Sequence, residues 1–472
     1  MMEERYLNLT VMPEFPQTEG VEAVLDNLQE RARATAVTTS PYVMAPAEGP
    51  GAGREPPGDT AAGSVRLLDR PLWGQRALTV RTAPSFEADR SLYDGLRYQP
   101  PPPDELTARD GPVVQSFLAA AKDRGLKTYL QIQAAIPPGY RVQFGGPEPD
   151  DQPLLPDGTS SGGRVDNNAS LASPQVKAYG CALIRDLCRA YPNVDGFRID
   201  WPEVPPYSFD SLFFDFGPHA AAAAERLGFD FARMRNDAAR LYGFLTGGLT
   251  DGHLTLALDS GEGPLSWLER CPGVHDLARF RACLVVELIG AYRAALSAAA
   301  GPGTELFIQG FPPPWQQVTG FDVARLAGSC QVIGVKLYTM HWPMIVRAYA
   351  DVLLAANPGL SAALLLRLLF SWLDLVDDGI PERLEEVAYP GPEEPHLAGP
   401  GAQARKIEAV RRAANGTPVV AMAHGYGPLE DVRARLAVAW RASGGKMAVN
   451  RYGYLSDEKL SALGQVTREA VP

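Results

Sequence analysis

The sequence is poor in cysteine and histidine, and this poverty argues against several kinds of site. Five cysteines form no CxxC pair, and an odd number fits no complete disulfide framework. Six histidines include no HExxH and no HxH at the end of a strand pattern, so a zinc protease or a metal-dependent amidohydrolase is not indicated. Neither GxGxxG after the first strand nor GxxxxGK[ST] occurs, which argues against dinucleotide and P-loop sites. We therefore expect no metal and no cofactor.

Positive charge is also scarce. The chain of 472 residues has 44 Lys+Arg against 55 Asp+Glu, a formal net charge of −11, whereas phosphate binding needs a basic footprint. The first residues do not combine a basic region with an apolar stretch, and the apolar run 362–375 is short and interrupted by Arg367. We expect a cytoplasmic location, with neither nucleic acid nor a membrane as partner; the oligomeric state stays open.

What the sequence has is an alternation of strand and helix patterns. Eight apolar, β-type runs are each followed by a helical pattern, and such an alternation predicts a parallel sheet with right-handed crossovers. The runs are 6–12, 35–40, 127–134, 194–200, 305–311, 331–338, 418–425 and 446–453. Eight units are the number that closes a TIM barrel, so we predict an α/β fold with one (β/α)8 barrel over residues 1–472. A doubly wound open sheet is the alternative, and LTLALD (254–259) is a rival strand.

Glycine and proline, 46 and 42 residues, show no Gly-X-Y period and therefore mark loops rather than collagen. They concentrate in four long segments, 41–112, 134–172, 201–273 and 357–417, which follow predicted strands two, three, four and six. These insertions should therefore lie at the C-terminal face of the barrel, where barrel enzymes have their active sites.

The segment VDGFRIDWPE (194–203) is the richest in chemistry. Arg198 and Asp200 are two apart in a strand and should point to the same side, at the barrel mouth. An Arg close to an Asp favours the ionised carboxylate that a nucleophile requires. The alternative is an ion pair that braces the top of the barrel, and we favour the functional interpretation because carboxylates, an Arg and a Trp meet at one strand end. Trp201 offers a flat surface for stacking on a sugar, and Pro202 stiffens the approach of a second carboxylate, Glu203.

Other predicted strand ends are polar in a way that a closed core does not require. Amides, hydroxyls and a cation suit hydrogen bonding to sugar hydroxyls in a concave site, so we expect these residues to bind substrate. They are Gln131 and Gln133 on strand three, Gln309 on strand five, Lys336 and Tyr338 on strand six, His424 on strand seven, and Asn450 and Tyr452 on strand eight. Trp315 and Trp342 follow strands as well, either as stacking surfaces or as caps over the barrel.

The motif GFRID resembles the strand-four motif of the alpha-amylase family of glycoside hydrolases. A wider pattern, from NNASLASPQVKAYGCALIRDLCRAYPNVDGFRIDWPE through RFRACLVVELIGAYRAAL and FPPP to NRYGYLSDEKLSAL, resembles hypothetical glycoside-hydrolase-like TIM-barrel proteins over much of residues 125–470. The resemblance implies a nucleophile role for Asp200 and an orienting role for Arg198. It departs at strand five, which ends in Gln309 where the amylase family has Glu, and at strand seven, which ends in His424 where that family has Asp.

A second carboxylate would therefore have to come from a loop, because glycoside hydrolysis uses two. Glu203 is the first candidate and Glu262 the second. Three functions stay open: a glycoside hydrolase with a carbohydrate substrate, a carbohydrate-binding barrel without turnover, and a barrel lyase or isomerase that uses Lys336, Tyr338 or His424 for proton transfer.

Overall fold

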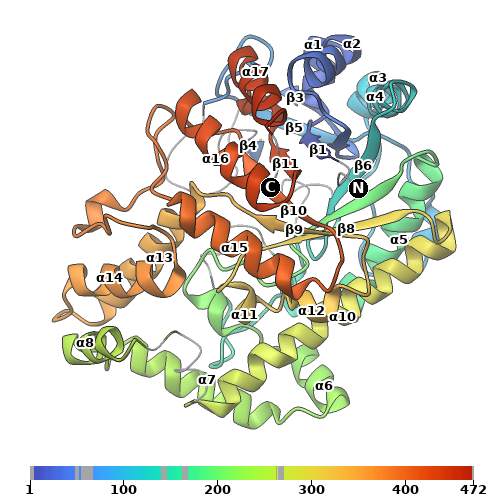
Figure 1. Cartoon of the computed structure of the whole chain (residues 1–472). Helices are drawn as coiled ribbons and strands as arrows, with labels where there is room; N and C mark the ends of the chain where they lie inside the picture. The colour runs from blue at the N-terminus through green and yellow to red at the C-terminus, as the bar shows by residue number, and fades with distance from the viewer. Residues whose placement is uncertain are drawn as a thin grey trace.

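Eight parallel strands close into a barrel at the centre of the molecule (Figure 1). The structure is a computed structural model that describes residues 5–47, 53–54, 67–139, 146–161, 168–261, 263 and 270–469. The barrel strands are β1 (Tyr6–Thr10), β2 (Ala36–Thr39), β6 (Lys127–Gln133), β7 (Gly196–Asp200), β8 (Glu305–Gly310), β9 (Val332–Lys336), β10 (Val419–His424) and β11 (Lys446–Asn450). Each of the eight predicted runs contains one of these strands.

Every barrel strand pairs in parallel with its neighbours in the chain, and β11 closes the circle by pairing with β1. The prediction of a (β/α)8 barrel is confirmed, and the open doubly wound sheet is excluded. The rival strand 254–259 lies inside a helix, α8 (Asp251–Ser260). Its residues Leu254 and Ala257 are buried three apart on one helical face, a period that strand pairing does not use.

Helices surround the barrel and bury an apolar face against it. The element after each strand supplies one or more of them: α1 (Glu14–Glu19), α2 (Val21–Asp26) with a π turn (Asn27–Arg31), α4 (Pro112–Asp123), α5 (Pro174–Ala190), α10 (Pro272–Ala300), α12 (Val323–Leu326), α13 (His341–Ala356), α15 (Pro400–Ala413), α16 (Leu429–Ala442) and α17 (Asp457–Val466). Local sequence sets their starts. Before α5, for example, the Ser173 hydroxyl accepts the Val176 N–H and Pro174 occupies the first turn.

The core has two parts. The larger fills the space between barrel and helices, and a smaller apolar cluster inside the barrel consists of Phe307, Val332, Val420, Met422 and Ala448. This inner cluster closes the barrel interior, so the fold has a packed centre rather than a pore.

The predicted insertions contain regular structure, part of which the sequence did not reveal. In 41–112, β3 (Tyr42–Pro46), β5 (Thr79–Pro84) and β4 (Gly53–Arg54) form a small antiparallel sheet, followed by α3 (Glu105–Asp110). The segment 201–273 contains α6 (Pro218–Leu227), α7 (Phe231–Leu245) and α8, and 357–417 contains α14 (Ala362–Leu373) and α15. Short 3-10 turns lie at Arg90–Tyr93, Pro149–Asp151, Asp210–Phe213, Leu384–Glu386 and Tyr452–Tyr454.

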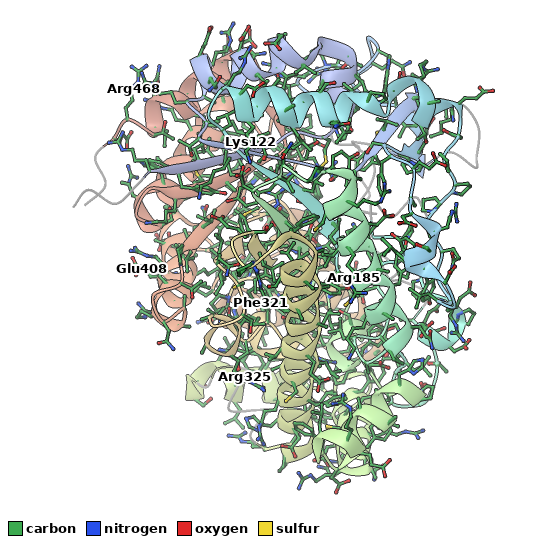
Figure 2. The ribbon with its side chains drawn as sticks, turned by 90° about the vertical axis from the view of Figure 1, so that its right-hand side faces the viewer. Lys122, Arg185, Phe321, Arg325, Glu408 and Arg468 are labelled. Carbon is green, nitrogen blue, oxygen red and sulfur yellow. The ribbon has the colours of Figure 1, made fainter. Side chains whose placement is uncertain are left out.

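The helix α10 runs beside α5 in Figure 2, where Arg185 marks α5 and Arg325 marks the segment after β8. Within the described residues, α10 is the one helix with the length and hydropathy of a membrane span. Its apolar residues pack on α5, α7 and the β8 segment, and residues such as Phe280, Leu288 and Leu296 are buried there. Its composition is therefore that of a core helix.

Gly180 of α5 allows this close approach to α10. A Cβ at this position would overlap the Tyr292 hydroxyl and lie 2.6 Å from Tyr292 Cζ. We expect Gly180→Ala to lower the free energy of unfolding by about 1–3 kcal/mol through overpacking, although alanine favours helices. Gly290→Ala on α10, where a Cβ has no neighbour within 4 Å, is the matched control and should raise it by up to about 1 kcal/mol. Urea unfolding measures both, and equal effects would contradict tight packing at Gly180.

Candidate functional site at the barrel mouth

Polar side chains from most of the barrel strands meet at the C-terminal end of the barrel. Strand register sets this group, because paired residues such as Gln133, Asp200 and Gln309 lie side by side and point to the same side of the sheet. Contacts between strands that are not neighbours show that this side is the interior. The group consists of Thr10, Gln131, Gln133, Arg198, Asp200, Gln309, Lys336, His424 and Asn450.

Arg198 lies across the barrel interior and holds two strands. Its Nε donates to Gln131 Oε1 at 2.8 Å, and its Nη2 donates to Thr10 Oγ1 at 2.7 Å. The side chain is fully buried, and burial lowers the pKa of the Arg198 guanidinium from its ordinary value. Arg198 therefore braces β1, β6 and β7 directly below Asp200.

The partner of Asp200 is Lys336 rather than Arg198. Lys336 Nζ lies 2.8 Å from Asp200 Oδ1, and their side chains are 1% and 13% exposed. Asp200 Oδ1 also accepts the Trp201 N–H at 3.0 Å, and Asp200 Oδ2 accepts Gln131 Nε2 at 3.4 Å. The predicted Arg–Asp pair is thus replaced by a Lys–Asp pair, because Arg198 is occupied one layer lower. Asp200 is held by two hydrogen-bond donors and by the ion pair with Lys336, and it keeps part of its surface toward the mouth.

Trp201 leaves the strand with a backbone conformation that only glycine adopts easily. Its φ is +50°, which costs an ordinary residue about 1 kcal/mol and is common at functional sites. Lys336 Nζ lies 5.4 Å from the centroid of the Trp201 ring and 4.9 Å from that of Phe311. The Trp201 ring also contacts Tyr207 edge to face. The rings of Trp201 and Phe311 thus form an aromatic wall next to the Lys336–Asp200 pair.

Glu203 is buried and holds the segment after β8. Its Oε1 accepts the Phe311 N–H at 2.7 Å, and its Oε2 accepts the Thr319 hydroxyl at 2.5 Å. Burial raises the pKa of Glu203 from 4.5 to about 7, against the attraction of Lys336. Both oxygens are therefore used within the protein, and the structure does not bring this carboxylate to the open part of the mouth.

Several buried polar atoms around the mouth have no hydrogen-bond partner. Gln309 is fully buried, yet neither its amide nitrogen nor its oxygen is paired. The same holds for Gln133 Oε1, Arg198 Nη1 and Trp201 Nε1. Such groups cost free energy unless something satisfies them, and in native proteins they are rare. Around Asp200 a polar ligand would therefore find hydrogen-bond partners that the protein leaves unused.

Histidines and tyrosines form the other wall of the mouth. The Tyr338 ring contacts His341 and His424 edge to face, with centroids 5.9 and 5.5 Å apart. His424 Nδ1 accepts the Tyr426 N–H at 3.1 Å, which assigns the proton of a neutral ring to Nε2. Tyr207 Oη lies 3.0 Å from His341 Nδ1. Tyr338 and His424 thus lie where the sequence placed them, and Asn450 is the register partner of His424.

Other predicted residues lie elsewhere. Tyr452 donates to Glu19 Oε2 at 2.8 Å and packs on Phe15, outside the mouth, because β11 ends at Asn450 and a turn follows. Trp315 and Trp342 are buried against each other and cap the core. Glu262 lies outside the described residues.

Sequence reasoning missed four contributors: Thr10, Tyr207, Thr319 and His341. Thr10 ends the first strand and could have been predicted, because the C-terminal ends of all barrel strands lie at the same end of the barrel. Tyr207 lies on the segment after β7, Thr319 ends the short helix that follows β8, and His341 begins α13, so only the fold brings them together at the mouth. Within the described residues, no three His, Cys, Asp or Glu side chains are grouped as metal ligands, and the five cysteines are free.

Comparison with known proteins gives the fold. No protein-family model and no curated protein matches the chain. Among solved structures, a β-galactosidase from the psychrophilic Marinomonas ef1 matches 98% of this chain and 59% of its own, with 14% identity and a TM-score of 0.51. The catalytic domain of a β-amylase from Paenibacillus polymyxa (9% identity, 98% and 97% covered, TM-score 0.48) and an α-L-fucosidase from Paenibacillus thiaminolyticus (10%, 98% and 49%, 0.48) follow.

The chain thus spans about three fifths of the β-galactosidase, and at this identity the likeness establishes the fold. The molecule is a (β/α)8 barrel, a fold that it shares with this β-galactosidase. The resemblance drawn from the sequence is confirmed at this level.

Proposed function

We propose that the chain is a glycoside hydrolase that cleaves an O-glycosidic bond of a carbohydrate or glycoconjugate bound at the barrel mouth. The observation that carries the proposal is the set of unpaired buried polar atoms around Asp200, which sugar hydroxyls would satisfy. The aromatic wall of Trp201 and Phe311 offers the flat apolar surface that sugar rings stack on. The β-galactosidase with this fold supports the same substrate class.

In this proposal Asp200 is the nucleophile or base. It ends a barrel strand, it is partly exposed, and its position is held by Lys336, Gln131 and the Trp201 N–H. Lys336 compensates the carboxylate charge in surroundings where an unpaired charge would be costly. Gln309, Gln133 and Asn450 bind hydroxyls, with Tyr338 and His424 as the opposite wall.

Glu203 has a positioning role in this mechanism. Because both of its oxygens hold the segment Phe311–Thr319, it sets the aromatic ring that covers Lys336. The acid that protonates the leaving group would then come from another loop, and Glu262 stays the prediction from the sequence. A cytoplasmic location also stays a prediction.

A carbohydrate-binding barrel without turnover is the second candidate. The specific observation in its favour is that Lys336 compensates the charge of Asp200 while Glu203, three residues later, is buried. A panel of chromogenic glycosides and oligosaccharides separates the two functions, since hydrolysis that disappears in Asp200→Asn supports the first. Saturable sugar binding without hydrolysis in the wild type supports the second.

Gln309 provides a test of the binding surface itself. Replacing it by leucine removes two buried unpaired groups, so Gln309→Leu should raise the free energy of unfolding by about 1–3 kcal/mol. The same change should weaken sugar binding about tenfold, because two hydrogen bonds to the ligand are lost. Calorimetry of unfolding and of sugar binding measures both effects. Gln115→Leu, at an exposed glutamine on α4, is the control, and unchanged affinity in Gln309→Leu would remove Gln309 from the site.

A further inference from the structure

A cavity lies among the helices of the insertions, beside the segment that follows β8. It has a volume of about 210 Å³ and lies between α7, α8, α10, α13, α14 and the short helix α11 (Gln316–Thr319). In Figure 1 α7, α8, α13 and α14 gather at the lower left, away from α1 and α2. Its walls include Phe213, Leu241, Leu277, Trp315, Leu365 and Trp372.

The lining is mostly apolar, and most of its polar atoms are paired; Arg281 Nε and Trp315 Nε1 are the buried exceptions among the described residues. Arg281 Nη1 donates to Val318 O at 2.6 Å, and Arg281 Nη2 donates to Leu212 O at 3.0 Å. The Tyr349 hydroxyl donates to Pro206 O at 2.5 Å, and the His253 ring is held at the start of α8 by Thr250. These groups satisfy backbone carbonyls and a helix cap, so the walls offer a ligand mainly hydrocarbon surface.

Size and access fit a small molecule. An apolar cavity of about 150 Å³ binds benzene, so about 210 Å³ suits a ligand of about eight non-hydrogen atoms. Leu241, Leu369 and Trp372 are partly exposed, so part of the lining reaches the surface. We propose that this cavity is a binding site for an uncharged apolar molecule, an alkyl or aryl group, separate from the barrel mouth and independent of the proposed hydrolase function.

The cavity shares one wall with the mouth. Trp315 lines the cavity and contacts Phe311, with ring centroids 6.4 Å apart, and Phe311 in turn covers Lys336. Trp315 and Trp372 both line the cavity, so we expect their fluorescence to change when a ligand binds there.

Titration with ethylbenzene tests the site, with erythritol, a polyol of similar size, as the polar control. We expect ethylbenzene to change tryptophan emission saturably and to raise Tm by about 1–2 °C near saturation, and erythritol to do neither. Ala278→Leu fills the cavity and should weaken ethylbenzene binding at least about tenfold, whereas Ala294→Leu, exposed on the same helix, should leave it unchanged.

Two results would overturn the proposal. One is the absence of a saturable change with ethylbenzene in the wild type, which needs no variant to fold. The other is equal ethylbenzene affinity in Ala278→Leu and the wild type, since binding would then take place elsewhere.

Discussion

Asp200→Asn is expected to abolish hydrolysis and to destabilise the protein at the same time. As nucleophile or base the carboxylate contributes about 10³-fold or more to kcat/KM, so activity toward any glycoside that the wild type cleaves should fall by that factor. The change also leaves Lys336, 1% exposed, without its ion-pair partner. Breaking a buried pair costs about 3–5 kcal/mol of unfolding free energy. Denaturant unfolding and a glycoside panel measure the two effects.

A double variant separates the two effects. Asp200→Asn with Lys336→Met removes both charges and should recover most of the lost stability, because the uncompensated charge is the cause of the loss. Its hydrolytic activity should stay absent. Asp378→Asn, an exposed aspartate, is the matched control and should change stability by less than about 0.5 kcal/mol. Undiminished hydrolysis in Asp200→Asn would reject Asp200 as nucleophile or base, and undiminished stability would reject the buried ion pair.

The pH dependence of stability should reveal Glu203. Burial raises its pKa from 4.5 to about 7, so between these values the folded protein binds more protons at Glu203 than the unfolded chain does. The free energy of unfolding contributed by this residue must then fall as pH rises from 4.5 to 7 and stay constant above. The loss over that window is about 3 kcal/mol.

Glu203→Gln isolates this contribution. The amide oxygen can accept the Phe311 N–H and the amide nitrogen can donate to the Thr319 hydroxyl, so both contacts survive without a titrating group. The stability difference between Glu203→Gln and the wild type should therefore grow in favour of the variant from pH 4.5 to 8. Urea unfolding at several pH values measures it. A difference that changes in the opposite direction would mean that attraction to Lys336 outweighs burial.

The barrel was predictable because each of its strands is buried on both sides and reads as a nearly continuous apolar run. The sheet of β3, β5 and β4 was not, because Tyr42–Pro46 and Thr79–Pro84 pair across a long insertion that carries no periodic pattern. The helices of 357–417 were read as a loop, because its proline-rich second half dominated the interpretation.

The candidate site was predictable in part for a similar reason. Spacing along one strand places Arg198 and Asp200 on the same side, but it cannot say which side chains meet across a closed barrel. Which side chains meet depends on the register of the strands. This register places Lys336, from a strand two places away in the barrel, beside Asp200. The alternation of side chains along a strand predicted that Tyr452 lies beside Asn450 at the mouth. The strand β11 ends at Asn450, however, and Tyr452 lies in the turn that follows. The burial of Glu203 depends on the segment after β8, which no local pattern reports.

The ion pair between β7 and β9 also has an evolutionary consequence. Asp200 and Lys336 come from different βα units, which are separated in the chain by β8 and α10 among other elements. A mutation that neutralises one of them therefore leaves the other charge buried without its partner. Divergent descendants should therefore exchange Asp200 and Lys336 together or keep both.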